Sequence, residues 1–319
     1  MKLNQFFFSL LLTITSQTVL SAETDTFTLR DEPLEDSSEI INERANFYLG
    51  NSIKAANSKN EGCTENQLYV EIRKYFNNHT KGQLAIDILK DGSIPKRTVK
   101  LSESVYRSWR PWDGLGMGLT LAKKSGLTVS PVIKFGSELI GTDKFEHFFG
   151  QGFYYFSDNY LEEKGATKAT KVGIFKEKTI LGGNKVGNGV FSYGDLAANF
   201  NGMRFWNHVL QLRDDVLGAD HNIGPYVNCE DNKWVQVKKI DFRDYIDSSM
   251  DESINCSKFP AQATADRFAD QVQRLGMSCP VDPKKLDELA IKYGAVSKWI
   301  INKDGIGVLK FFGEFKYKK

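Results

Sequence analysis

Long hydrophobic segments are scarce in this chain of 319 residues. The apolar stretch near the N-terminus, residues 6–14, is shorter than the roughly 20 residues that a membrane-spanning helix needs, and no later segment approaches that length. A strong charge of either sign is also missing, since the formal net charge is +2. The composition therefore predicts no integral membrane segment and gives no electrostatic reason to expect a nucleic-acid partner.

Several spacing motifs of known enzyme classes are missing too. The chain has only four histidines and no zinc signature. The glycine cluster within residues 182–189 lacks the spacing of a phosphate loop or a dinucleotide-binding loop, and no serine lies in a nucleophile elbow. We therefore expect no cofactor and no metal ion.

The first 22 residues resemble a secretory signal peptide, with a positive start, an apolar centre and a small-residue exit at Leu20-Ser21-Ala22. Its removal takes one lysine and leaves 41 basic against 40 acidic residues, a net charge of +1. We expect export to the periplasm or secretion. In an oxidising compartment the four cysteines favour two disulfides, and three pairings are open.

The remaining chain predicts an acidic, mobile leader at residues 23–35 and a single mainly helical domain at residues 36–319, with minor β-hairpins. Helical spacing of apolar residues appears at 40–53, 68–76, 261–275 and 283–301. Alternation and turn residues predict a β-hairpin over 84–101, and residues 172–181 suggest a strand. We expect this domain to be a monomer.

Two short segments carry most of the chemical information: residues 141–156 and 192–206. The first has no charged residue between His147 and Asp158, so its helix should be buried. Helix capping explains part of each segment, because Asp143 with Glu146, and Ser192 with Asp195, have capping-box spacing. Capping leaves other polar residues unexplained, which lie at helical spacing along two faces: His147, Gln151, Tyr154, Asn199 and Trp206.

Glycines at 150, 152 and 202 would let these two helices approach closely. Asp195 could then contact His147 and fix its tautomer. Glu146, enclosed in the same apolar pocket, would have a raised pKa and could act as a general acid. A structural polar network explains the same residues equally well, and a metal held by Asp143, His147, Asp195 and Asn199 is a third interpretation.

Aromatic and cationic residues gather beside a proline turn at Trp109, Arg110 and Trp112. Sugar rings stack on such surfaces, so these side chains are candidate walls of a substrate cleft. Core packing is the alternative, because large aromatic side chains are usually mostly buried.

The two segments contain Gly-x-Asp-Lys-x-x-His-Phe-Phe-x-x-Gly, from Gly141 to Gly152, and Tyr-x-Asp-Leu-x-x-Asn-x-x-Gly, from Tyr193 to Gly202. This pair resembles motifs of exported envelope proteins and, more loosely, of VanZ-like membrane proteins, from which the chain differs in lacking spanning helices. The chain also resembles secreted proteins of predatory bacteria, a group that includes a lysozyme specific for deacetylated peptidoglycan.

That resemblance implies a lysozyme-like helical fold and cleavage of peptidoglycan by one essential glutamate. Glu146 is the candidate acid, assisted by Asp143, His147 or Tyr154, with Asp195 as a second carboxylate. Gln151, Asn199 and Trp206 would bind the substrate. The alternatives are a non-catalytic envelope protein with a structural or ligand-binding core, and a metal-dependent hydrolase.

Overall fold

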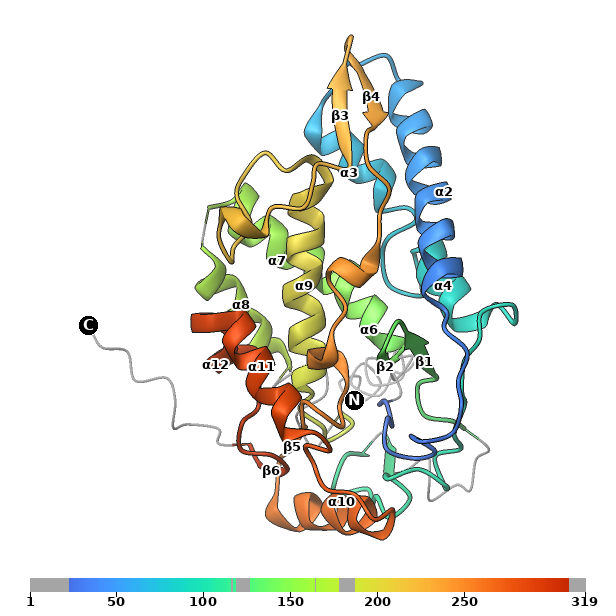
Figure 1. Cartoon of the computed structure of the whole chain (residues 1–319), viewed down its shortest axis with the longest axis vertical. Coiled ribbons are helices and arrows are strands. Elements are labelled where there is room, and N and C mark those ends of the chain that lie inside the picture. Colours follow the sequence, from blue (N-terminus) through green and yellow to red (C-terminus); the bar gives the residue numbers. More distant parts are fainter. Residues whose placement is uncertain (1–22, 116, 119–126, 164, 178–186, 310–319) are drawn as a thin grey trace, which may run out of the picture.

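The computed structural model describes residues 23–115, 117–118, 127–163, 165–177 and 187–309. Helices dominate this part of the chain (Figure 1): α2 (Ser38–Asn57), α3 (Glu65–Ile72), α4 (Gln83–Lys90), α6 (Asp143–Glu146), α7 (Gly152–Phe156), α8 (Ala166–Lys176), α9 (Tyr193–Leu210), α10 (Gln262–Arg274), α11 (Pro283–Tyr293) and α12 (Ser297–Ile300). The described strands form two-stranded sheets: antiparallel β1 (Val132–Phe135) with β2 (Glu138–Gly141), antiparallel β3 (Val227–Glu230) with β4 (Lys233–Gln236), and parallel β5 (Lys258–Phe259) with β6 (Gly307–Val308). The fold is mainly helical with small hairpins, as expected.

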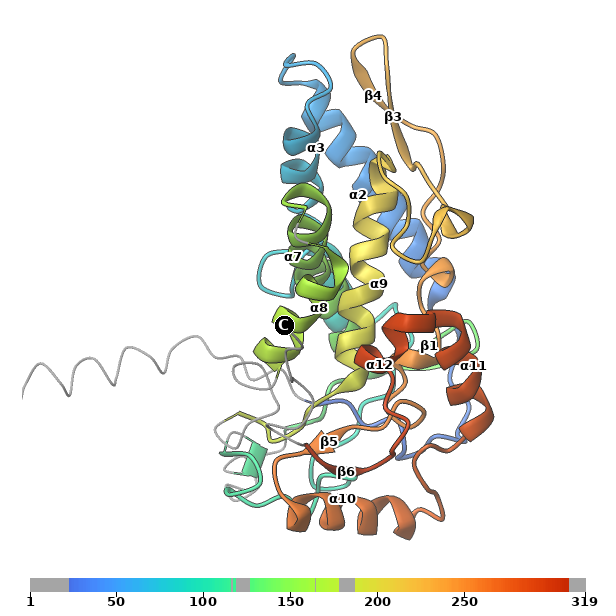
Figure 2. The same ribbon diagram turned by 90° about the vertical axis from the view of Figure 1, so that its left-hand side faces the viewer.

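Helix α9 lies at the centre of the molecule, with α7 along one side (Figures 1 and 2). Its residues from Gly194 to Leu210 are all buried. Such a helix needs partners for its polar side chains as well as for its apolar ones, because an unpaired buried polar group is costly.

The helix that packs against α9 contains two π-helical turns, η2 (His147–Gln151) and η3 (Ser157–Leu161). A π turn uses one residue more than an α turn, so the side chains after it are rotated by about 100° relative to a regular helix. The face that contacts α9 therefore passes through Gly152 and Tyr155 instead of Gln151 and Tyr154. The regular spacing of an α-helix does not predict this rotation of the side chains that follow the π turn.

Several expected elements are confirmed. Helices α2, α3, α10 and α11 lie where apolar spacing predicted them; in α2, for example, Ile41, Ala45, Leu49 and Ile53 form the buried face. The hairpin over residues 84–101 is wrong, because residues 83–90 form α4 and bury Leu84, Ala85 and Ile88 at helical spacing. Backbone at Arg97 is extended, as expected, but it pairs with Val132.

The strand predicted at 172–181 is also wrong for its described part, since residues 166–176 form α8. Residues 178–181 of that prediction lie outside the described residues. The β-branched Val172 and Ile174 suit a strand, but here they lie on a helix whose Gly173 packs against Tyr155. Tertiary packing has overridden local preference.

The acidic leader begins inside the molecule. Residues 23–28 are buried, so the expectation of a mobile segment is wrong for them. Asp25 explains part of this: its carboxylate accepts hydrogen bonds from the backbone N–H groups of Phe27 and Thr28 and from that of Val105, each at 2.9 Å. Thr24 also forms a parallel bridge with Ser130.

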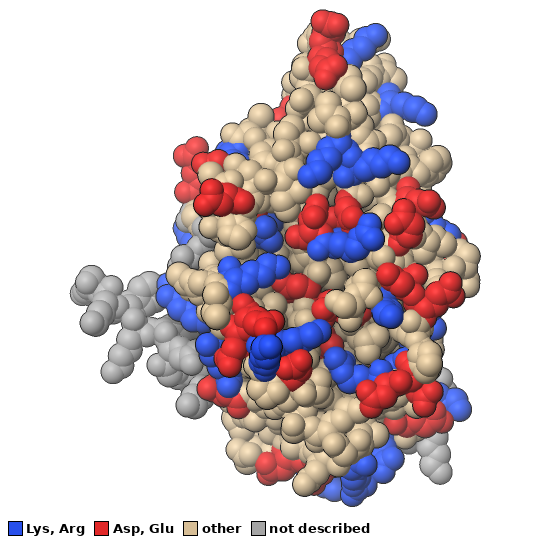
Figure 3. Space-filling model, viewed as in Figure 1, with Lys and Arg blue, Asp and Glu red and all other residues tan. Residues whose placement is uncertain are grey.

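The four cysteines form two disulfides, Cys63–Cys229 and Cys256–Cys279. The first ties the loop before α3 to β3, and the second joins segments that flank α10. On the face shown in Figure 3, basic and acidic side chains are interspersed, without a large area of one sign. This fits the nearly neutral composition.

Candidate functional site

The two sequence motifs meet where the first helix crosses α9. A Cβ atom added to Gly152 would lie 2.7 Å from the Cα of Gly202, and one added to Gly202 would overlap the carbonyl oxygen of Phe148. These two glycines therefore permit the close approach that the sequence suggested. Gly150 does not contribute, since its nearest neighbours are Asn77 and Asn78.

A buried lysine lies at the centre of the crossing. The Lys144 side chain is only 1% exposed, and its ammonium lies 2.9 Å from Asp143 Oδ2, 2.6 Å from Asp195 Oδ1 and 2.6 Å from Glu252 Oε1. Burial by itself lowers the pKa of Lys144, but these three carboxylates outweigh it and hold the pKa well above its usual value. Burial raises the pKa of Glu252 to about 7, although Lys144 opposes the shift.

Lys144 and Glu252 are not among the site residues that the sequence predicts, although Lys144 lies within the first motif. The signal for Lys144 was present, because it is the one basic residue in an otherwise apolar and acidic helix start. Glu252 comes from a loop 108 positions along the chain, and no local pattern marks it.

The expected capping roles need partial correction. Asp143 does not cap its helix: Thr142 occupies the N-cap position, and the Asp143 Oδ1 atom accepts hydrogen bonds from the hydroxyls of Thr24 at 2.6 Å and Ser130 at 3.2 Å. Ser192 does cap α9, accepting from the Asp195 backbone N–H at 3.1 Å, and its hydroxyl donates to Glu252. The carboxylates of Asp143 and Asp195 thus remain available to the Lys144 cluster.

Another buried acid comes from the N-terminal segment. Glu23 is 8% exposed, and its carboxyl accepts a hydrogen bond of 2.9 Å from the Asn188 amide. Burial and the neighbouring Glu252 carboxyl raise its pKa well above the ordinary value. The centre of the molecule therefore holds more carboxyl groups than one lysine can neutralise.

His147 lies between residues of α9, as the helical faces predicted. Its Nε2 atom is 3.2 Å from Asp195 Oδ2, and its Nδ1 atom is 3.1 Å from Asn199 Oδ1. Burial raises the pKa of Asp195, but His147 and Lys144 outweigh burial and lower it. Asn199 acts here as a positioning residue for His147 and is 2% exposed.

Glu177, at the end of α8, is a further residue that the sequence did not reveal. It is 2% exposed, and a carboxylate oxygen lies within 4.8 Å of ligand-type atoms of both His147 and Asp195. Burial and Asp195 raise its pKa well above the ordinary value, and the attraction of Lys144 and a backbone hydrogen bond from Ser192 only partly oppose the shift. Its Oε2 atom has no hydrogen-bond partner among the described residues.

Glu146 points the other way, to the wall of a cavity of about 280 Å³. Its side chain is 19% exposed and contacts the Nδ1 atom of His79 through Oε1. Burial raises the pKa of Glu146, and the contact with His79 opposes the shift. The sequence expectation of a raised pKa is confirmed, but the surroundings are polar instead of apolar: Arg73, Asn77, Asn78, Lys81, His147, Gly150, Gln151 and Tyr154.

Two further expected site residues, the substrate-binding Gln151 and the catalytic Tyr154, line the cavity. Trp206 does not, because it is completely buried and its indole N–H donates to the Phe149 carbonyl at 3.1 Å.

The aromatic residues near the proline turn also lie elsewhere. Trp109 is buried, and its indole donates to the Asn188 carbonyl at 2.9 Å. Arg110 and Trp112 are exposed and stack on each other at 5.5 Å. In the part of the chain that the structure describes, none of these three residues lines the Glu146 cavity. Trp109 therefore follows the alternative expectation, which was core packing.

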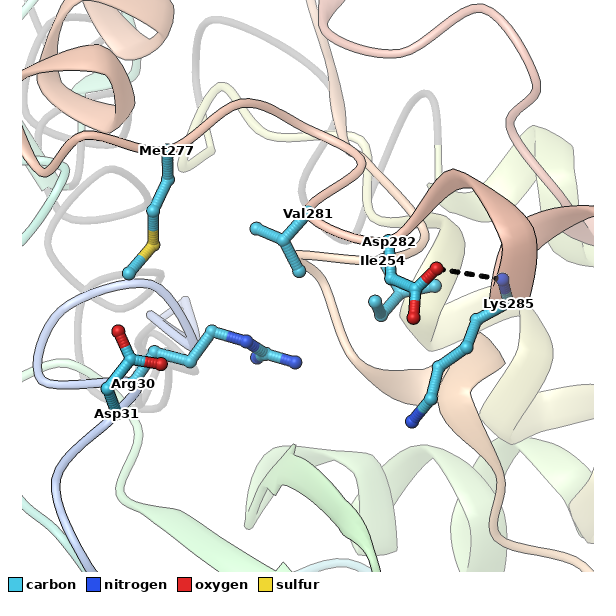
Figure 4. Close-up of a pocket in the computed structure, with 7 residues that line it drawn as sticks. All are labelled: Arg30, Asp31, Ile254, Met277, Val281, Asp282 and Lys285. Carbon is cyan, nitrogen blue, oxygen red and sulfur yellow. Dashed lines mark hydrogen bonds between the residues drawn. The ribbon is translucent and has the colours of Figure 1, made fainter.

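A second cavity of about 330 Å³ lies between the N-terminal segment and the start of α11. Figure 4 shows Arg30 and Lys285 reaching into it from opposite sides. Both cations already have partners, Arg30 with Asp251 at 2.8 Å and Lys285 with Glu138 at 3.4 Å. This cavity contains none of the residues of the two motifs.

Together these contacts define an exceptionally polar interior, with a Lys144-centred cluster on one side of His147 and an accessible polar cavity on the other. Comparison with protein-family models, with curated proteins and with solved structures gives no match. Within the described ranges, no helix is both long and apolar enough to cross a membrane.

Proposed function

We propose that this protein is an exported glycoside hydrolase that cleaves the glycan strands of peptidoglycan, with Glu146 as the general acid. One observation carries the proposal: a largely buried carboxyl group lies on the wall of a polar cavity that reaches the surface. Burial favours the protonated form of Glu146, which is the form that can donate a proton to a glycosidic oxygen.

The cavity lining suits a polyhydroxylated ligand. The amides of Asn77, Asn78 and Gln151 can both donate to and accept from sugar hydroxyls. Arg73 lies 4.1 Å from the ring centre of Phe153, which fixes its guanidinium at the cavity edge. The Nε atom of Arg73, a lining residue, is buried without a hydrogen-bond partner among the described residues, so a polar ligand would satisfy it.

The arrangement supports a mechanism with a single acid. Glu146 is the one carboxylate among the described residues that line the cavity. Asp195, which we expected as the second carboxylate, is engaged by Lys144 and His147 and lies outside that lining. In the proposed reaction Glu146 protonates the leaving oxygen as its bond to the sugar carbon breaks. Glu146, now a carboxylate, then takes the proton from a water that attacks the sugar carbon.

The lysozyme-like activity is tested with the purified mature protein on acetylated and on deacetylated peptidoglycan. We expect muropeptides with new reducing ends, measured by liquid chromatography and mass spectrometry. Glu146→Gln should lower the rate by about 10²- to 10⁴-fold, the usual contribution of a general acid. Glu288→Gln, an exposed carboxylate on α11, is the matched control and should retain full activity.

Absence of product from both substrates would refute the proposal. Full activity of Glu146→Gln would place the acid elsewhere, even if the wild-type protein cleaves the glycan.

A non-catalytic envelope protein is the second candidate. The completely buried Trp206 and the Lys144 cluster favour it, because both rigidify the crossing of the two motif helices. In that case Glu146→Gln would leave envelope phenotypes unchanged, whereas variants that loosen the helix crossing would not.

The proposed location outside the cytoplasm is supported by the two disulfides. If export follows the expected signal peptide, intact-mass measurement of the exported protein should give a chain that begins at Glu23. A chain that keeps residues 1–22 would contradict this expectation.

A further inference from the structure

Two carboxylate clusters share Asp195, and they differ in how their negative charge is balanced. In the first, Asp143, Asp195 and Glu252 surround the Lys144 ammonium, so the chain supplies its own cation. In the second, Glu177 and the Oδ2 atom of Asp195 lie beside the imidazole of His147. Lys144 also attracts the Glu177 carboxylate, but its ion pairs are with Asp143, Asp195 and Glu252.

We propose that His147, Glu177 and Asp195 bind a divalent transition-metal ion, for which Zn²⁺ is the probe. The ligand-type atoms of the three side chains lie within 4.8 Å of one another. Imidazole nitrogen and carboxylate oxygen are a donor set that such ions accept. This inference goes beyond the proposed glycosidase activity and does not depend on it.

The clearest sign of a missing partner is Glu177 Oε2. This atom is buried in a residue that is 2% exposed, yet it has no hydrogen-bond partner among the described residues. Orphaned buried polar atoms are rare in native proteins, since each costs about 1–3 kcal/mol. A cation between Glu177 and its two neighbours would satisfy it.

The geometry at His147 points to the same place. The Nδ1–H group of His147 donates a hydrogen bond to Asn199 Oδ1, so the Nε2 atom carries the lone pair of the neutral ring. This lone pair faces Asp195 Oδ2 at 3.2 Å. Two electron-rich atoms at this distance need a proton or a metal ion between them. Two ligand atoms that share an ion at about 2.1 Å are roughly 3.0 to 3.4 Å apart. The observed separation lies in that interval.

Each ligand is also held from behind, as metal ligands usually are. Asn199 holds His147, the Lys144 ammonium holds Asp195 through its other oxygen at 2.6 Å, and a backbone hydrogen bond from Ser192 reaches Glu177. His147 also lines the 280 Å³ cavity. The proposed site therefore shares one ligand residue with a cavity that opens to solvent.

The experiment uses the full mature chain, stripped with a chelator and then titrated with Zn²⁺. Elemental analysis after gel filtration should give about one ion per chain. Glu177→Gln and His147→Gln should each weaken binding by at least about tenfold, because each removes a ligand. His208→Gln is the matched control: His208 is buried against Asp215, but Arg204 already balances that carboxylate at 2.9 Å.

A readout on the wild-type protein keeps the test independent of whether the variants fold. The NMR signals of the His147 ring should shift on Zn²⁺ addition, while those of His208 should not. No saturable binding by the wild-type protein, or a shift confined to histidines other than His147, would overturn the inference. Neither result depends on glycan cleavage.

Discussion

Replacing Lys144 with methionine tests whether one buried cation holds the crossing of the motif helices together. Methionine keeps most of the apolar stem of lysine and removes only the ammonium. Three carboxylates, with side-chain exposures of 6%, 8% and 3%, then lose their shared partner. Removal of one member of a buried ion pair typically costs about 3–5 kcal/mol, because the other charge remains buried.

We expect a loss of about 4 kcal/mol at pH 7. Three carboxylates would raise the cost above that of a single pair, but the Glu252 carboxyl, with a pKa of about 7, is already partly protonated. Since domains are stable by only about 5–15 kcal/mol, this is a large share of the total. With a urea slope of about 3 kcal/mol/M, the unfolding midpoint should fall by roughly 1.3 M.

The loss should depend on pH in a defined direction. Without Lys144, the folded protein binds protons at the cluster more readily than the unfolded chain does. Such a group stabilises the fold at low pH, and this contribution is lost as the pH rises. The difference between Lys144→Met and wild type should therefore be smaller at pH 5 than at pH 8, and adding Glu252→Gln should restore part of the stability.

Urea unfolding followed by tryptophan fluorescence, with the disulfides intact, measures these differences. Lys284→Met is the control, since the Lys284 side chain is 88% exposed and its nearest acidic partner is 4.0 Å away; it should change stability by no more than about 0.5 kcal/mol. A loss below about 1 kcal/mol in Lys144→Met at pH 7 would refute the reasoning.

Three further predictions concern packing, covalent constraint and titration. Gly202→Ala should lower the stability measured by thermal unfolding by about 1–3 kcal/mol or more, because the new methyl group would overlap backbone atoms. The control is Gly50→Ala, which is also in a helix but has open space around it and should be neutral or stabilising. Equal effects of the two variants would contradict the packing argument. Replacing both Cys63 and Cys229 with serine removes a disulfide that spans 166 positions, and the free energy of unfolding should fall by about 5 kcal/mol through loop entropy. Urea unfolding measures this loss. A loss under about 2 kcal/mol would mean that the unfolded chain is already restricted without the disulfide. Burial lowers the pKa of His208 below 6.5. The unfolded chain therefore binds a proton at His208 at a higher pH than the folded protein does, so stability should fall as the pH drops below about 6.5. His208→Gln should flatten the profile below about pH 6.5, and an unchanged slope there would assign it to another group.

The helices with long, regular apolar spacing could be predicted from sequence. Helices α2, α10 and α11 are at least eleven residues long, and their buried residues recur every three or four positions, which leaves little ambiguity. Segment 83–90 has only eight residues, and its apolar positions fit two-residue and helical repeats alike. Packing against the core selected the helix in this segment, and it also selected a helix in α8, where a strand was predicted.

The spacing of the motifs predicted part of the site. It gave the contact of Asp195 with His147 and the close approach at Gly152 and Gly202. It failed beyond His147, because the π turn η2 rotates the following side chains. Tyr154 therefore faces the cavity, and Tyr155 turns toward Asn199.

The sequence by itself determined the mainly helical class, the two motif helices, the near-neutral charge and the presence of two disulfides, because all of these follow from composition or from repeats within a few turns. Only the tertiary structure decided which charges meet. Lys144, Glu252, Glu177 and Glu23 lie on segments far apart in the chain, and no local pattern encodes a contact between them. Burial then sets their pKa values, since it depends on everything packed around each group.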